Sequence, residues 1–218
     1  MKRVFGACAL LASLWIPAGT AQAGIAFRAV MTHDQEVASP GVPFQGSSGI
    51  ATFFLNDAQT RLTYDVQLTG LDLRRIDPLT GNPNQAIPAG DPNDDVLRLH
   101  IHRALVGANG AIVFGMIDAN AGLRNDISPN NLIIDANTLH ITGAWDLLEG
   151  ANNNSGITLG TELANLLGGG LYINVHTSDH AGGEIRGQIL PLPEPSAISL
   201  LAIAMLGLGA FGGRKRSV

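Results

Sequence analysis

The chain has 218 residues, with 13 Lys and Arg against 18 Asp and Glu, and a formal net charge of −5. That length suits one domain with short appendages, and an apolar fraction of 45% excludes a chain that is disordered throughout. The acidic balance argues against nucleic acid as a partner, because a nucleic-acid binder needs a basic field. These averages hide a difference between the two ends of the chain and its middle.

The first 23 residues have the three parts of a secretory signal peptide. A basic start is followed by an apolar run at residues 4–16 and by a small-residue cleavage site, Ala21 and Ala23, before Gly24. The apolar run is too short to span a membrane comfortably. We therefore expect signal peptidase to cleave after Ala23 and the rest of the chain to be exported across the inner membrane.

The middle of the chain, residues 24–193, differs from the average composition. It contains no Lys and no Cys, holds all six histidines, and carries eight Arg against 17 acidic residues. An exported domain without Cys has no disulfides, so its stability depends on its apolar core.

Period-two alternation of apolar side chains along this middle part predicts β-strands. A helical pattern occurs once, at 161–167 before Gly168, with Thr158 or Thr161 as the capping residue. Residues 74–95 are polar and rich in turn residues, which predicts a long loop without regular structure. Many short strands and one brief helix predict an antiparallel β-sandwich. The expected strands are 52–55, 61–68, 96–102, 111–117, 132–134, 139–145, 171–177 and 183–189.

The last two of these strands form the clearest hairpin. Matching of their apolar faces places His176 beside Glu184 or Arg186 on a polar face. We expect Glu184 and Arg186 to form an ion pair on the surface, which contributes little to stability.

Three histidines are candidates for a metal site. His100 and His102 are two residues apart on one strand, so their side chains point the same way, about 7 Å apart along it. His176 completes a three-histidine site if its strand adjoins residues 96–102. Imidazole suits zinc or copper, and copper/zinc superoxide dismutase is also a sandwich with a His-x-His strand, although that analogy concerns the fold alone.

The alternative interpretation, which we favour on sequence grounds, gives these histidines a structural role. They would lie on the polar face and hydrogen-bond to Glu184, Arg186 or Asn174. Arg98 on the same face supports this interpretation, because a cation disfavours a metal ion nearby.

Two other kinds of site have weak signals. Asp91, Asp94 and Asp95 offer oxygen ligands for calcium, but they lack EF-hand spacing, so a solvated acidic loop is the favoured interpretation. The sequence contains no nucleophile motif and no phosphate-binding loop, so we expect no enzymatic activity and no cofactor.

Near the end of the chain, Pro193, Glu194 and Pro195 precede an uncharged segment at 196–213, which is long enough to cross a bilayer, and a basic end follows. With these three parts in this order, the last 28 residues, 191–218, resemble a PEP-CTERM sorting signal. The resemblance implies a Gram-negative bacterium that makes exopolysaccharide, and processing of the chain by an exosortase. The alternative is an ordinary C-terminal membrane anchor.

Motifs of one known family occur along the middle of the chain, at 27–29 with 35–37, 49–53, 62–66 with 70–71, 99–102, 172–177 and 183–189. Through these motifs, residues 24–190 resemble the CHRD domain. The resemblance implies an immunoglobulin-like β-sandwich and no established catalytic activity. We therefore expect an exported, non-enzymatic protein of the cell envelope or extracellular matrix, with a matrix polysaccharide or a surface protein as partner. The alternative is a dismutase-like redox protein that binds zinc or copper through His100, His102 and His176.

Overall fold

The computed structural model describes residues 24–37, 46–78, 80–83, 86, 90–92, 94–120, 123–124, 126, 131–149 and 156–193. In these residues, strands dominate, with one α-helix and one short 3-10 helix. The elements are β1 (Ile25–Thr32), η1 (His33–Gln35), β2 (Ser48–Leu55), β3 (Arg61–Thr69), β4 (Ile76–Asp77), β5 (Asn82–Pro83), β6 (Val96–Arg103), β7 (Ala111–Ile117), β8 (Ile133–Asp135), β9 (His140–Asp146), α1 (Leu159–Leu167), β10 (Leu171–Thr177), β11 (Ile185–Gln188) and β12 (Leu190–Pro191).

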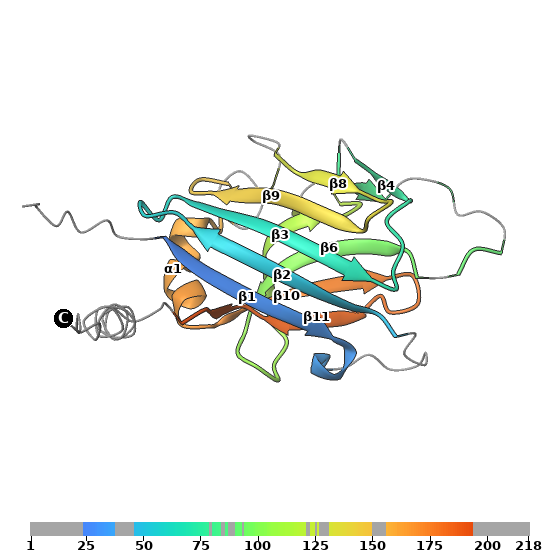
Figure 1. The fold of residues 1–218 in the computed structure, drawn as a ribbon. Coiled ribbons are helices and arrows are strands. Elements are labelled where there is room, and N and C mark those ends of the chain that lie inside the picture. The colour runs from blue at the N-terminus through green and yellow to red at the C-terminus, as the bar shows by residue number, and fades with distance from the viewer. Residues whose placement is uncertain are drawn as a thin grey trace, which may run out of the picture.

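One antiparallel sheet contains most of these strands. Its hydrogen-bonded order is β7-β6-β10-β11-β1-β2-β3-β9-β8, and β12 pairs with β1. The sheet folds over on itself, so that β1, β2, β3 and β9 form a layer in front of β6, β10 and β11 (Figure 1). Phe114 of β7 stacks on Trp145 of β9, with ring centroids 4.7 Å apart, so the two ends of the strand order meet across the core.

The all-β, antiparallel prediction is therefore confirmed. The immunoglobulin-like expectation went further, since that arrangement has two separate sheets, whereas the strands described here follow one continuous hydrogen-bonded order.

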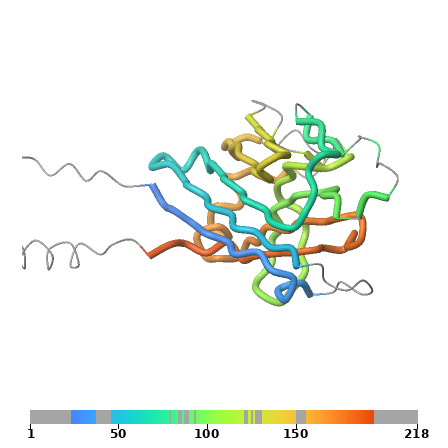
Figure 2. Tube along the Cα trace, turned by 45° about the vertical axis from the view of Figure 1, so that its right-hand side comes forward, coloured from blue at the N-terminus to red at the C-terminus, as the bar shows by residue number. Residues whose placement is uncertain are grey.

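The two layers join where β11 meets β1. Thr32 of β1 pairs with Arg186 of β11, and Phe27 pairs with Pro191 of β12. Gly187 allows the close approach at this join, because a Cβ there would lie 2.6 Å from the carbonyl oxygen of Val30. The described chain consequently begins and ends at the same end of the molecule (Figure 2).

The front layer follows the alternation in its sequence. Leu62, Tyr64, Val66 and Leu68 of β3 are buried in the core, and the residues between them are exposed. The expected strands 52–55 and 61–68 are confirmed within β2 and β3, which pair antiparallel and have one buried and one exposed face.

The back layer differs from the prediction. Strands β10 and β11 are buried at every position, although about half of these positions carry polar side chains. Glu184 and Arg186 are each 2% exposed, so the predicted surface ion pair is wrong. Loops cover this face: Arg186 donates to the carbonyl of Ala108 in the β6–β7 loop, and the ring of His33 in η1 bonds the backbone carbonyl of Glu184.

The predicted helix is confirmed as α1, and it begins two residues earlier than expected. Thr158 is its N-cap: its side chain accepts a hydrogen bond from the backbone N–H of Thr161, and the Thr161 hydroxyl accepts one from the N–H of Thr158. The expected loop at 74–95 is less irregular than predicted, because β4 and β5 form a two-residue antiparallel ladder within it.

The predicted signal peptide lies outside the described residues, as do Glu194, Pro195 and the segment 196–213. Gly24 and Pro193 are described and stand at the borders of the domain. Among the described residues, no helix has the length and apolar character to cross a membrane.

Candidate metal centre

Strands β6 and β10 are neighbours, which brings the three predicted histidines together. In their antiparallel register, Tyr172 faces His102, Asn174 faces His100 and His176 faces Arg98. His102, His100 and His176 therefore occupy three successive rows of one sheet face. Their ring centroids are 5.4 to 6.0 Å apart.

One nitrogen atom from each imidazole lies within 4.8 Å of one nitrogen of each of the others. This separation lets a single ion contact all three rings, since zinc–nitrogen bonds are about 2.0–2.1 Å long. The condition set by the sequence, that the strand of His176 adjoin that of His100 and His102, is met.

Each histidine uses one ring nitrogen in a hydrogen bond. The partner of His100 Nε2 is Asp118 Oδ2 at 2.8 Å, that of His102 Nδ1 is the carbonyl oxygen of Gly110 at 3.0 Å, and that of His176 Nδ1 is the carbonyl oxygen of Ala181 at 3.0 Å. The sequence had suggested Glu184, Arg186 or Asn174 as partners, which is wrong. Those residues lie on the same face, but the loops that cover it supply the backbone carbonyls.

The second ring nitrogen of each histidine is buried and has no hydrogen-bond partner within the part of the chain that the structure describes. These atoms are His100 Nδ1, His102 Nε2 and His176 Nε2. Because a carbonyl oxygen only accepts, the bonded nitrogens of His102 and His176 carry the proton, and the free nitrogens present a lone pair. Lone pairs of neutral imidazole are the form that binds metal ions.

Burial favours this neutral form. Removal from water is the main reason that the pKa of His102 falls from 6.5 to about 3 and that of His176 to about 4. Both side chains are less than 10% exposed. Two of the three candidate ligands are therefore uncharged at any pH near neutrality.

Asp118 orients the third candidate. Its carboxylate is 2% exposed and holds the Nε2 side of His100, while its other oxygen accepts from the backbone N–H of Asn120 at 2.6 Å. Burial alone would raise the pKa of Asp118, but the hydrogen bonds from His100 and Asn120 and the charge of Arg98 hold it below the ordinary range. In metal sites, a carboxylate commonly accepts a hydrogen bond from the outer nitrogen of a ligating histidine, which fixes the tautomer and the orientation of the ring.

In the sequence analysis, the positive charge of Arg98 was a reason to expect no metal ion nearby. In the structure its Nε lies 3.5 Å from Asp118 Oδ2, so its charge is balanced by that carboxylate. Asp118 itself was missed by the sequence analysis. Its signal was its position directly after the buried strand 111–117, but the pairing of that strand with 96–102 was unknown.

A second group of metal-ligating residues lies in the predicted acidic loop. The structure brings two of the predicted residues, Asp91 and Asp94, together with Asp72. The sequence analysis did not identify Asp72. Arg74 already balances this group, since its side chain pairs with both Asp72 and Asp91. Asp95, the third predicted calcium ligand, is instead buried 3.7 Å from Arg75. We assign no metal to this group.

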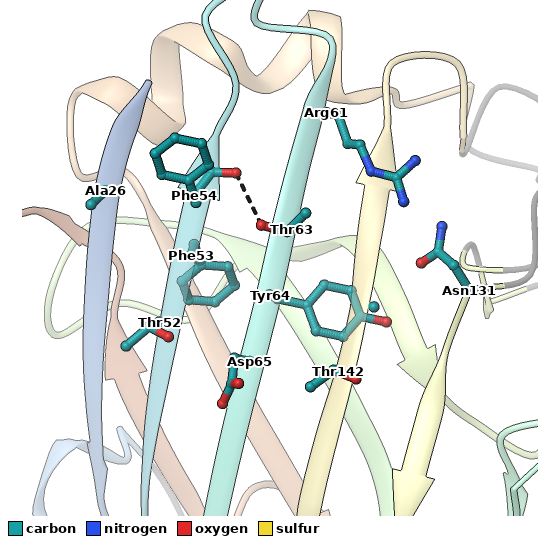
Figure 3. A pocket seen from close by; sticks show the side chains of 11 residues that line it. Ala26, Thr52, Phe53, Phe54, Arg61, Thr63, Tyr64, Asp65, Asn131 and Thr142 are labelled. Atoms are coloured by element: carbon teal, nitrogen blue, oxygen red, sulfur yellow. Dashed lines mark hydrogen bonds between the residues drawn. The ribbon is translucent and has the colours of Figure 1, made fainter. Parts of the chain in front are cut away.

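A shallow hollow of about 560 Å³ lies on the outer face of β1, β2, β3 and β9 (Figure 3). Thr52, Thr63 and Asp65 line it with polar groups, and the ring of Phe54 at its side is half exposed. Arg61 and Asn131 lie at the end towards β9 (Figure 3). No histidine lines this hollow among the described residues, so it is separate from the candidate metal centre.

Comparison with known proteins gives a family and no closer relative. Neither the curated proteins nor the solved structures contain a significant match to this chain. The model of the CHRD domain matches residues 27–189, which span the strands from β1 to β11 and all three histidines. The chain therefore belongs to the CHRD domain family.

Proposed function

We propose that this protein binds one transition-metal ion, zinc or copper, through His100, His102 and His176. Two observations support the proposal: each of the three rings has a buried nitrogen without a hydrogen-bond partner among the described residues, and one nitrogen of each ring lies within 4.8 Å of one nitrogen of the others. All three are acceptors in neutral imidazole, and a water molecule has only two hydrogens to donate. A metal ion satisfies all three at once, and imidazole suits zinc and copper.

The metal content of the purified full-length protein tests this proposal directly. Elemental analysis and calorimetric titration with Zn²⁺ and Cu²⁺ should give one ion per chain. The triple variant His100→Ala, His102→Ala, His176→Ala should lose that ion. His140→Ala is the matched control, because His140 also bonds an aspartate but is exposed and lies in the front layer. Absence of bound metal in the natural protein, or retention in the triple variant, would refute the proposal.

The absence of enzymatic activity stays a prediction. Three histidine ligands leave a coordination position open, as in catalytic sites, so the dismutase-like alternative remains the second candidate activity. Superoxide consumption by the copper-loaded protein, compared with the triple variant, distinguishes a redox enzyme from a metal-binding domain.

The proposed cellular location is the envelope or extracellular matrix of a Gram-negative bacterium. Signal peptidase would act after Ala23, and an exosortase would recognise Pro193, Glu194 and Pro195. The described chain leaves the sheet through exposed residues, with Leu190 and Leu192 about half exposed, which supports access of a processing enzyme. Mass spectrometry of the native C-terminus tests this: an intact C-terminus at residue 218 would contradict processing.

A matrix partner would bind at the outer hollow. A half-exposed aromatic ring beside threonine and aspartate side chains suits a polysaccharide, which offers apolar ring faces and hydroxyl groups. Co-sedimentation with the organism's exopolysaccharide should fall for Phe54→Ala and stay unchanged for Leu148→Ala, which replaces an exposed apolar residue elsewhere. Equal sedimentation of both variants and the natural protein would refute this binding site.

A further inference from the structure

Asn174 lies in the middle of the candidate metal centre. It faces His100 across the β6–β10 pair, in the row between that of His102 and that of His176. An ion in contact with all three histidines is centred over this middle row, since His102 and His176 reach it from the rows on either side. The side chain of Asn174 is on the same sheet face as these rings, because it alternates with buried core residues as His176 does.

The amide oxygen of Asn174 is also an unsatisfied acceptor. The residue is 4% exposed, and its Oδ1 has no hydrogen-bond partner among the described residues. The cation facing Asn174 on β11, Arg186, gives its terminal N–H groups to Asn109 and to the carbonyl of Ala108, and its plane covers the ring of Tyr172. A buried acceptor left in this state costs about 1–3 kcal/mol.

We propose that the Asn174 side-chain oxygen is the fourth donor to the metal ion. It would occupy the coordination position that three histidine ligands leave open, and a set of three nitrogens and one oxygen then favours a metal-binding domain over the dismutase-like alternative. This inference rests on the proposed three-histidine centre and adds a ligand to it. The face then holds four buried acceptors without a partner among the described residues, three ring nitrogens and the Asn174 oxygen, which is twice the number that one water molecule can satisfy.

The added oxygen has a consequence for metal choice. Soft ligands select Cu(I), whereas imidazole and oxygen donors suit divalent ions. The centre therefore selects Zn²⁺ or Cu²⁺ over Cu⁺, and the Cu²⁺ form gives a paramagnetic signal that reports its ligands.

Two substitutions of Asn174 test the proposal in the purified full-length protein. Asn174→Leu keeps the size of the side chain and removes the oxygen, and it should weaken Zn²⁺ and Cu²⁺ binding by about tenfold or more. Asn174→Asp keeps an oxygen donor and adds a negative charge, so it should bind these ions at least as tightly as the natural protein. The Cu²⁺ electron paramagnetic resonance spectrum should change in the leucine variant.

Gln188→Leu is the matched control. Gln188 is a buried amide on the same sheet face, but its N–H groups donate hydrogen bonds to the carbonyl oxygens of Ala104 and Gly169. This variant should lower the melting temperature of the metal-free protein and leave the dissociation constant of the metal unchanged.

The outcomes separate the two proposals. Unchanged metal affinity and an unchanged Cu²⁺ spectrum in Asn174→Leu would overturn the fourth-ligand inference and leave the three-histidine centre intact. Absence of metal binding in the natural protein would overturn both. If Asn174→Leu fails to fold, weaker binding by Asn174→Asp than by the natural protein overturns the inference.

Discussion

The contact between Asp118 and His100 gives the sharpest prediction for the metal centre. Asp118→Leu removes the acceptor that holds the proton on His100 Nε2. The proton is then free to move to Nδ1, the buried nitrogen that has no partner among the described residues, and a protonated nitrogen cannot bind metal. We expect the metal affinity to fall by about 10- to 100-fold, which corresponds to about 1.4–2.7 kcal/mol.

Asp118→Asn should have a smaller effect, because its amide oxygen still accepts from Nε2. The matched control is Asp65→Leu, which removes the aspartate partner of His140 at a similar distance of 3.0 Å, but with both side chains exposed. Calorimetric titration with Zn²⁺ measures the dissociation constants of the natural protein and the three variants, and circular dichroism checks folding. A folded Asp118→Leu variant with the natural affinity would refute the assignment of Asp118 as a positioning residue.

Four further predictions concern stability. Between pH 7 and pH 5 the metal-free protein should lose about 2 kcal/mol of unfolding free energy. His102 and His176 have pKa values of about 3 and about 4 in the fold and stay neutral there, while the same residues take up protons in the unfolded chain, so each lowers the unfolding free energy by about 2 kcal/mol. Burial raises the pKa of Glu36 to about 7, so Glu36 takes up its proton in the fold first and offsets about 2 kcal/mol of this loss. Urea denaturation at both pH values measures this, and a rise in stability would contradict it. A chelator should lower the unfolding free energy of metal-loaded protein by about 2.7 kcal/mol if the free metal was at about 100 times its dissociation constant; an unchanged melting temperature would count against bound metal. Thr158→Ala should cost about 1 kcal/mol through loss of the helix cap, read from the urea midpoint, and no loss would show that the cap is dispensable. Gly187→Ala should cost about 1–3 kcal/mol, because its Cβ meets the backbone of Val30, and a neutral effect would mean that β1 and β11 can separate.

The elements that the sequence predicted well are those whose pattern is local. The alternation in 61–68 and 171–177 and the threonine before 159–167 each determine an element without help from distant residues. The pairing of β4 with β5 involves only two residues on each strand. Such a short ladder depends on its surroundings in the fold, and no periodicity marks it in the sequence.

The candidate site divides in the same way. The spacing of His100 and His102 and the face of His176 are local properties, and they singled out three residues that the structure brings together. The prediction that these residues lie on a solvent-exposed face was wrong. It was made because a strand that alternates between apolar and polar residues is typical of a sheet with one face in water. The loops that cover this face are remote in sequence, and Asp118 enters through the pairing of β7 with β6.

The burial of this polar face changes the free-energy cost of leaving the histidine nitrogens without a ligand, and so changes which interpretation of the histidines is favoured. On a wet face, a free ring nitrogen bonds water at no cost, so the structural role would need no metal. On a covered face, His100 Nδ1, His102 Nε2 and His176 Nε2 each lose that water, and each buried acceptor without a partner costs about 1–3 kcal/mol. A natural domain has only about 5–15 kcal/mol of net stability. In a domain without cysteine, a bound ion that satisfies these atoms removes this penalty and also links β6 to β10, which disulfides cannot do here.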